Sequence, residues 1–177
     1  RPIWFSPGAV MVVGTGGEWG ADMSTEFTVL TEIVTGAGSG IGLAGSKALN
    51  AAGTRVFGLD IQQGDMAPYA TWIICDVGDT ASVGTAFAKI RESTGVIDIL
   101  ANNAGIGAVG TVADATDDEW SRVMNINVAG IGRVSSAALP FLLKSSSPSI
   151  VNTCSIAATA GLPKRAVYSA SKGAVLS

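Results

Sequence analysis

Short apolar runs alternate with segments of helical spacing along most of the chain, from Phe27 onward. The apolar runs predict five strands, at residues 29–35, 55–60, 71–75, 96–101 and 149–153. After the first run, apolar and small residues recur at i, i+3, i+7, i+8 and i+11 from Ile41, which predicts a helix that stops at Gly53. Three more helices are predicted, near residues 80–92, over about 117–143 and from about 165.

The predicted strands are continuous apolar runs rather than alternating ones, which is typical of a parallel sheet buried on both faces. Their alternation with helices predicts an α/β fold, a Rossmann-like doubly wound parallel sheet in three α/β/α layers. Thr116, with Glu119 three residues later, predicts a capping box at the start of the long helix. Such a sheet normally has six strands, so we expect its C-terminal strands to be missing, with the strand at 149–153 left as an exposed apolar edge.

Residues 1–26 follow no sustained period and contain two of the four tryptophans and two prolines. We expect them to form an irregular N-terminal extension. The alternative is a short ordered arm that packs on the core. Residues 27–177 are then expected to form one domain, an incomplete one if the C-terminal strands are missing.

Composition excludes several classes of protein. The chain has 177 residues, a formal net charge of −3, 47% hydrophobic and 14% charged residues, which is unlike a disordered protein. An acidic chain without a basic stripe argues against a nucleic-acid partner. Because the chain has no histidine, it cannot use Ser-His-Asp or Cys-His catalysis or a zincin-type site, and we predict no metal.

The cysteines and the longest apolar runs indicate the cellular compartment of the protein. Cys75 and Cys154 have neither the spacing of a zinc site nor that of a redox pair, so we predict two buried thiols in a reduced, cytoplasmic protein. No apolar run approaches the roughly 18 residues that cross a bilayer, so no membrane association is expected.

A glycine-rich turn is the first candidate for binding chemistry. Residues 35–42 read TGAGSGIG, directly after the first predicted strand and at the start of the first helix. Glycines there allow a tight turn and a close approach to a pyrophosphate, whose charge is stabilised by the free N–H groups of the helix start. A glycine run alone is more often an ordinary turn, but its place between strand and helix favours dinucleotide binding.

Asp60 ends the second predicted strand, 18 residues beyond Gly42. A carboxylate there can accept hydrogen bonds from both ribose hydroxyls of NAD, and it repels the 2′-phosphate of NADP. Neither Ile61 nor the residues between the glycines offers a cation for that phosphate, so the sequence predicts NAD as the cofactor. The alternative is a solvated aspartate at the end of a strand.

Tyr168 and Lys172 stand four residues apart on one face of the last predicted helix. A neighbouring ammonium stabilises phenolate and would lower the pKa of Tyr168 from its usual value of about 10. Without histidine, this pair is the best acid–base candidate in the chain, although such spacing also occurs by chance on exposed helices.

Two further polar residues stand out. Asn127 falls on the apolar face of the long predicted helix, where its amide must find hydrogen bonds or cost about 1–3 kcal/mol. It either caps a broken backbone turn or binds a water. Ser155 follows the fifth predicted strand, at the sheet edge where open α/β sheets place ligands, but serines are common in this chain.

Taken together, these residues make the chain from about residue 28 to 177 resemble the N-terminal two-thirds of a short-chain dehydrogenase/reductase. The matching segments are TGAGSGIG at 35–42, DV at 76–77, NNAG at 102–105, NVAG at 127–130, Ser155, and YSASK at 168–172. Ser155 stands 13 residues before Tyr168, as that family requires.

The resemblance implies a role for each matching residue at the cofactor. The cofactor-binding residues are expected to be Gly36, Ser39, Gly40, Ile41, Gly42, Asp60, Asp76, Val77, Asn102, Ala104, Gly105, Tyr168 and Lys172. Among them, Asp60 would hold the adenosine ribose, and Asp76 and Val77 would flank the adenine. Asn102 would line the nicotinamide side with Ala104 and Gly105, whereas Asn103 would brace the sheet.

The resemblance also implies a catalytic set of Asn127, Ser155, Tyr168 and Lys172. Tyr168 would exchange a proton with the substrate oxygen, which Ser155 would hold. Lys172 would lower the pKa of Tyr168 and bind the nicotinamide ribose, and Asn127 would hold a water that links Lys172 to solvent.

The function this implies is an NAD-dependent oxidoreductase that interconverts a secondary alcohol and its ketone. Arg165, three residues before Tyr168, could bind the carboxylate of a hydroxy acid, or could be a solvated loop arginine. The alternative function is a non-catalytic dinucleotide-binding module, or an inactive fragment of such an enzyme, and we expect a product of this length to be poorly expressed or inactive. The resemblance further implies that the complete protein is a homodimer or homotetramer.

Overall fold

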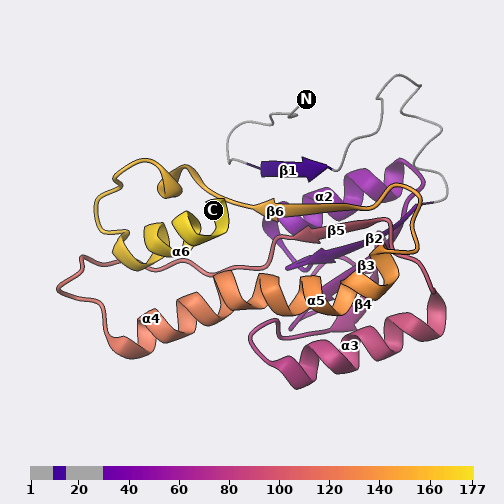
Figure 1. Cartoon of the computed structure of the whole chain (residues 1–177), viewed down its shortest axis with the longest axis horizontal. Coiled ribbons are helices and arrows are strands. Elements are labelled where there is room, and N and C mark those ends of the chain that lie inside the picture. The colour runs from indigo at the N-terminus through magenta and orange to yellow at the C-terminus, as the bar shows by residue number, and fades with distance from the viewer. Residues whose placement is uncertain (1–9, 15–29) are drawn as a thin grey trace.

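The computed structural model of the chain describes residues 10–14 and 30–177, and its centre is one six-stranded sheet (Figure 1). The strands follow the order β1-β6-β5-β2-β3-β4 across the sheet. Their bounds are β1 Val10–Gly14, β2 Thr31–Thr35, β3 Arg55–Asp60, β4 Thr71–Ile74, β5 Ile99–Asn102 and β6 Ser149–Thr153. The helices are α2 Gly40–Ala51, α3 Thr80–Ser93, α4 Asp117–Met124, η1 Asn125–Ala129, α5 Gly130–Leu142, η2 Ile156–Ala158 and α6 Ala166–Leu176.

The five strands predicted from the apolar runs form the parallel part of this sheet. Strands β2, β3, β4, β5 and β6 pair in parallel, so their carboxyl ends meet at one edge. Figure 1 shows α4 and α6 beyond that edge. The predicted Rossmann-like fold is therefore confirmed. Within the described part of the chain, no helix is both long enough and apolar enough to cross a membrane.

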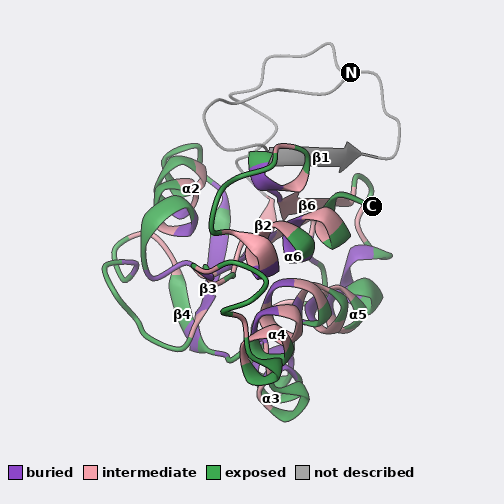
Figure 2. Ribbon diagram, turned by 90° about the vertical axis from the view of Figure 1, so that its left-hand side faces the viewer, coloured by how far each residue is buried: buried purple, intermediate pink, exposed green. Residues whose placement is uncertain are grey.

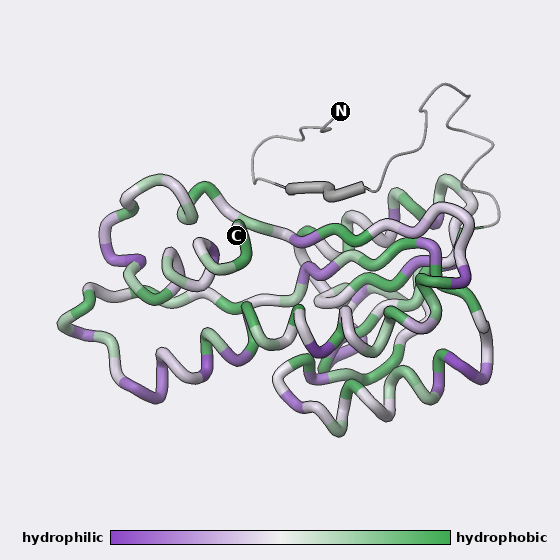
Figure 3. The backbone as a smooth tube through the Cα atoms, in the orientation of Figure 1, coloured by the Kyte–Doolittle hydropathy of each residue, from purple (hydrophilic) through white to green (hydrophobic). Residues whose placement is uncertain are grey.

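Helices cover both faces of the sheet. On one face, Ile33 and Phe57 of the strands pack with residues of α3 and α5. There, the ring centroids of Phe87 of α3 and Phe141 of α5 lie 6.0 Å apart. On the other face, a smaller cluster around Val34 packs against the leucines of α2. Figure 2 shows the buried residues between these layers, and Figure 3 shows that the strands are predominantly hydrophobic along their length. Because both faces are covered, the strands carry apolar runs rather than alternation.

The long helix predicted over 117–143 is interrupted by the π-helical segment η1. Here the N–H of Gly130 donates to the carbonyl of Asn125, five residues earlier. Single π turns of this kind commonly occur at functional sites. At the start of α4, the hydroxyl of Thr116 accepts the N–H of Glu119 at 3.2 Å, as predicted for the cap.

Strand β1 falls within the segment 1–26 that was expected to be irregular. It pairs antiparallel with β6 over five residue pairs, from Val10 with Thr153 to Gly14 with Ser149. The rest of that segment lies outside the described residues. The prediction that β6 forms an exposed edge is wrong in this structure, because β1 satisfies its backbone groups.

Glu32 is a buried acid on the central strand β2. It is only 2% exposed, and among the described residues its Oε2 has no hydrogen-bond partner. Burial raises the pKa of this carboxyl from 4.5 to about 8. The folded chain therefore retains a proton that the unfolded chain releases between pH 4.5 and about 8. Because of this, the stability that depends on Glu32 is greatest below pH 4.5 and falls as the pH rises toward 8.

We expect Glu32→Gln to flatten the pH dependence of stability. Between about pH 5 and about pH 8.5, the wild-type chain should lose on the order of 4 kcal/mol more unfolding free energy than the variant. Urea unfolding at both pH values measures the difference. The exposed Glu92→Gln serves as the control and should follow the wild type. An equally steep loss in Glu32→Gln would contradict the role assigned to this carboxyl.

Candidate active site

The glycine-rich turn joins β2 to α2 at the carboxyl edge of the sheet. Gly36 and Gly40 adopt φ values of +65° and +53°, which favour glycine, and a Cβ at Gly40 would meet nothing within 4 Å. Helix α2 starts without a side-chain cap at Ser39 and without an acidic residue in its first turn. Its first N–H groups therefore have no side-chain acceptor, and they form the positive end of the helix dipole. Such a helix start is suited to binding an anion.

The described helices differ in how they begin. The carboxylate of Asp79 caps α3 by accepting the N–H of Ala81 at 2.9 Å, and α4 carries three acidic residues in its first turn besides its threonine cap. Helices α5 and α6, like α2, have neither a side-chain cap nor an acidic residue in the first turn, but α5 continues directly from η1. At the glycine turn, a bound phosphate can take the place of the missing cap of α2.

Asp60 lies at the end of β3, facing the glycine turn. Its Oδ2 accepts the N–H of Gly38 at 2.9 Å, and its Oδ1 accepts the N–H of Gln62 at 3.1 Å. Two exposed apolar side chains, Ile41 and Ile61, stand on the same end of the site, 61% and 60% exposed. This end therefore combines a fixed carboxylate with open apolar surface.

A cleft of about 870 Å³ runs from this end to the first two turns of α6. Most of the residues predicted from the sequence line it, namely Gly36, Ser39, Gly40, Ile41, Asp60, Asp76, Val77, Ala104, Gly105, Ser155, Arg165, Tyr168 and Lys172. Three predicted residues do not line it: Gly42, Asn102 and Asn127. A volume of this size accommodates a cofactor-sized ligand.

Gly42 serves close packing instead of lining the cleft. A Cβ at Gly42 would overlap the carbonyl oxygen of Gly36 and would lie 2.6 Å from Nδ2 of Asn103. The start of α2 can approach the end of β2 only because residue 42 has no side chain.

The prediction that Asn102 lines the cleft is wrong, whereas Asn103 both braces the strand ends, as expected, and lines the cleft. Asn102 is 2% exposed, and its Nδ2 donates to Ser135 of α5 and to Asn152 of β6, so it braces the sheet. Asn103 lines the cleft, and its Nδ2 donates to the carbonyls of Thr35 and Gly36. The reason is the strand period: the last residue of β5 points into the layer below α5, and the next residue faces the glycine turn.

Tyr168 and Lys172 lie on α6 and face the same cleft. Nζ of Lys172 is 5.9 Å from the centroid of the Tyr168 ring and donates to the carbonyl of Thr153 at 2.7 Å. Lys172 is only 5% exposed, and burial lowers its pKa, an effect that the neighbouring Cys154 partly opposes. The ammonium is thus fixed beside the phenol at the carboxyl end of β6.

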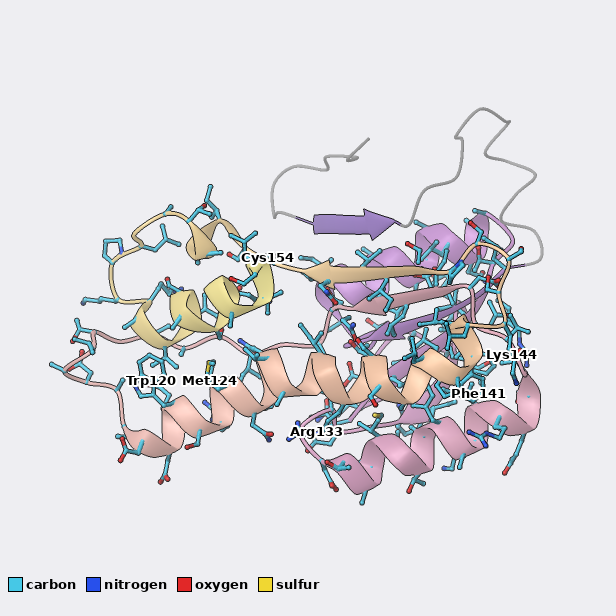
Figure 4. The ribbon with its side chains drawn as sticks, in the orientation of Figure 1. Trp120, Met124, Arg133, Phe141, Lys144 and Cys154 are labelled. Atoms are coloured by element: carbon cyan, nitrogen blue, oxygen red, sulfur yellow. The ribbon has the colours of Figure 1, made fainter. Side chains whose placement is uncertain are left out.

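Cys154 and Ser155 follow β6 where the strand enters the cleft. The thiol of Cys154 donates to the carbonyl of Lys172 at 3.3 Å, and Figure 4 shows Cys154 between β6 and α6. The hydroxyl of Ser155 accepts the N–H of Ala157 at 3.2 Å, which fixes it at the start of η2. The Cys154 contact holds the end of β6 against α6.

Asn127 lies behind the cleft within η1 and is 1% exposed. Its Oδ1 accepts the N–H of Ile106 at 2.8 Å, and its Nδ2 donates to the carbonyl of Ile106 and to the hydroxyl of Ser171. The amide therefore finds the hydrogen bonds that its place on an apolar face requires. Its side chain is committed to linking the 105–107 loop to α6, with Oδ1 3.2 Å from where a Cβ of Gly105 would stand.

Arg165 lines the cleft from the loop before α6. Its Nη1 donates to the carbonyl of Ala108 at 3.2 Å, and the two loops also pair through a bridge between Gly110 and Arg165. Within the described residues no other hydrogen bond of its side chain is found, so its other donors are available at the cleft.

The sequence analysis did not single out Thr35 or Ile106. The hydroxyl of Thr35 accepts the N–H groups of Asn103 and Ala104, both at 2.9 Å, and so shapes the turn after β5. A threonine directly before the glycine turn was the available signal for this role. Ile106 acts through its backbone, which no side-chain pattern reports.

Comparison with known proteins agrees with this geometry. The family model described as short chain dehydrogenase matches residues 31–177, and the chain belongs to that family. It is 35% identical over 143 residues to a 3-ketodihydrosphingosine reductase of Bacteroides thetaiotaomicron, covering 81% of this chain and 53% of the reductase. The chain therefore spans about half the length of that relative.

Two solved structures have the same fold. A ligand-free aldohexose dehydrogenase of Thermoplasma acidophilum superposes with a TM-score of 0.81 at 34% identity, over 86% of this chain and 59% of that one. A short chain dehydrogenase/reductase of Burkholderia phymatum, solved in complex with NAD, gives 0.79 at 30% identity, over 85% and 58% of the two chains.

Proposed function

We propose that the protein containing this chain is an NAD-dependent oxidoreductase that interconverts a secondary alcohol and its ketone. The observation that carries the proposal is that one cleft joins the uncapped glycine turn to Ser155, Tyr168 and Lys172. The family model is described as short chain dehydrogenase, and the relatives named above are a reductase and dehydrogenases.

The cleft fits an extended dinucleotide. Its pyrophosphate would be held by the free N–H groups at the start of α2, where Gly40 leaves room for the phosphate oxygens. The adenosine end would lie between Ile41 and Ile61 on one side and Asp76 and Val77 on the other. The nicotinamide end would reach Gly105 and Lys172.

Asp60 favours NAD over NADP. Its carboxylate is held in place by two backbone N–H groups and would accept the ribose hydroxyls, whereas a 2′-phosphate would meet a fixed negative charge. The NAD complex of the Burkholderia phymatum relative supports the same choice.

The nicotinamide ring, when bound, accepts or supplies the hydride. Tyr168 would exchange a proton between its Oη and the substrate oxygen, as a general acid or base. The ammonium of Lys172 lies 5.9 Å from the centroid of the Tyr168 ring and would bind the nicotinamide ribose. Ser155 would donate a hydrogen bond to the substrate oxygen, and Asn127 would keep α6 and the 105–107 loop in register.

We expect the substrate to carry a carboxylate. Arg165 stands one helical turn before Tyr168 and offers unused donors at the cleft. Arg165→Ala should raise KM for a hydroxy acid by roughly tenfold or more, since an ionic hydrogen bond contributes about 1.5–3 kcal/mol. KM for a neutral secondary alcohol should stay nearly unchanged.

Initial rates of NAD reduction with both substrates measure this effect in the full-length protein that contains this chain. Arg122→Ala is the matched control, because Arg122 is exposed on α4 and does not line the cleft. Equal changes in KM for the two substrates would remove the carboxylate from the proposal. The absence of any NAD-linked turnover in the wild type would remove the enzyme assignment.

A further inference from the structure

Arg133 lies on α5, outside the cleft, and is half-buried between two loops. Figure 4 shows it on the side of α5 that faces the beginning of α3. Its Nη1 donates to the carbonyl of Val77 at 3.3 Å, and its Nε donates to the hydroxyl of Thr80 at 3.2 Å. It therefore holds the turn that leads from β4 into α3.

The same guanidinium also binds the first residue of the π-helix η1. Nη2 donates to Oδ1 of Asn125 at 2.6 Å, and Nη1 donates to the carbonyl of Asn125 at 3.2 Å. This carbonyl also accepts the N–H of Gly130 that closes the π turn. Arg133 thus supplies a second, charged donor to the carbonyl on which the π geometry depends.

Asn125 completes a closed set of contacts. Its Nδ2 donates to the carbonyl of Gly78 at 3.0 Å, in the same turn that Arg133 holds. A Cβ on Gly130 would lie 3.0 Å from Cγ2 of Val77, so the turn and the π-helix are in direct contact without space between them. One guanidinium and one amide therefore join the two segments through five hydrogen bonds.

Both joined segments carry residues of the cleft. The turn presents Asp76 and Val77, and η1 presents Ile126. The next residue of η1, Asn127, holds the 105–107 loop and α6, which carries the catalytic tyrosine. The position of the adenosine end of the cleft relative to Tyr168 therefore depends on how the turn between β4 and α3 packs against η1.

We propose that Arg133 is a positioning residue for the cofactor: together with Asn125, it sets the 76–80 turn against the π-helix and so fixes the adenosine end of the cleft relative to the catalytic end. This inference rests on the proposed function. Its effect is on cofactor affinity, because the guanidinium touches neither the substrate nor the reacting atoms.

Arg133→Met retains an unbranched apolar stem and removes every donor. The Kd of NAD and that of ADP-ribose should both rise roughly tenfold, because carbonyls of the turn and of η1 lose their charged donor. KM for NAD should rise by the same factor, with kcat within about twofold. Arg133→Lys should recover part of the affinity, since one ammonium can reach some of the same acceptors.

Isothermal titration with NAD and with ADP-ribose measures these effects in the full-length protein. Arg91→Met is the matched control, because Arg91 lies on α3 away from the cleft, and it should bind both ligands as the wild type does. Asn125→Ala, alone and combined with Arg133→Met, tests whether the two residues act as one unit. The double variant should then bind ADP-ribose about as weakly as either single variant.

Several results would overturn the inference. The first is an unchanged affinity of Arg133→Met for ADP-ribose. The second is a loss of kcat in Arg133→Met that equals its loss of kcat/KM. The third is fully additive effects of the two substitutions in the double variant. Failure of Arg133→Met to fold would leave Asn125→Ala and Arg133→Lys to decide by the same measurements. Absence of NAD binding in the wild type would instead contradict the proposed function, so the two failures are distinct.

Discussion

Tyr168→Phe is expected to lower turnover by about 10²–10⁴-fold while the Kd of NAD stays within about threefold of the wild type. The change removes one hydroxyl and leaves the ring in place. The cleft still contains the glycine turn, Asp60 and Lys172, whose backbone and side-chain contacts do not involve that hydroxyl. A general acid or base is lost, but the surfaces that hold the dinucleotide remain.

The measurement combines steady-state rates with direct titration of NAD in the full-length protein. Tyr69→Phe is a matched control, because the chain has only two tyrosines and Tyr69 stacks with Lys47 outside the cleft. It should change neither quantity. Full turnover in Tyr168→Phe would show that another group moves the proton. A parallel loss of NAD binding would show that Tyr168 supports the cofactor more than the chemistry.

Gly42→Ala is expected to destabilise the fold by about 3 kcal/mol and to weaken NAD binding by at least roughly tenfold. The new Cβ would overlap the backbone carbonyl of Gly36. It would also press on Nδ2 of Asn103, which is held by its hydrogen bonds to the carbonyls of Thr35 and Gly36. The start of α2 would have to move away from β2, and its N–H groups would leave the positions that suit a pyrophosphate.

Gly45→Ala is the control for this change, one turn further along the same helix. A Cβ there meets nothing within 4 Å, so alanine should stabilise the chain by about 0.5–1 kcal/mol through its better helix propensity. Urea unfolding and NAD titration on both variants give the comparison. Similar stability of the two variants would mean that the close approach at Gly42 is not required.

Much of the fold could be predicted because its signals are local. The strand at Arg55–Asp60 matches its apolar run, and the Thr116 cap is formed as its spacing predicted. The glycine turn and the Tyr168–Lys172 pair could also be placed at one sheet edge, because the carboxyl ends of parallel strands meet there.

The parts that could not be predicted depend on contacts distant in sequence. A strand alternates its side chains at every residue, so whether Asn102 or Asn103 faces the cleft is decided by the exact end of β5. Asn127, within the π turn, accepts the N–H of Ile106 and donates to Ser171, and these partners are 21 and 44 residues away in the chain. The pairing of β1 with β6 joins segments about 140 residues apart.

The most direct test is a crystal structure of the full-length protein with NAD. The pyrophosphate should lie on the N–H groups at the start of α2, the adenosine ribose on the Asp60 carboxylate, and the nicotinamide within reach of Tyr168 and Lys172. A dinucleotide bound elsewhere, or one whose nicotinamide points away from α6, would contradict the account.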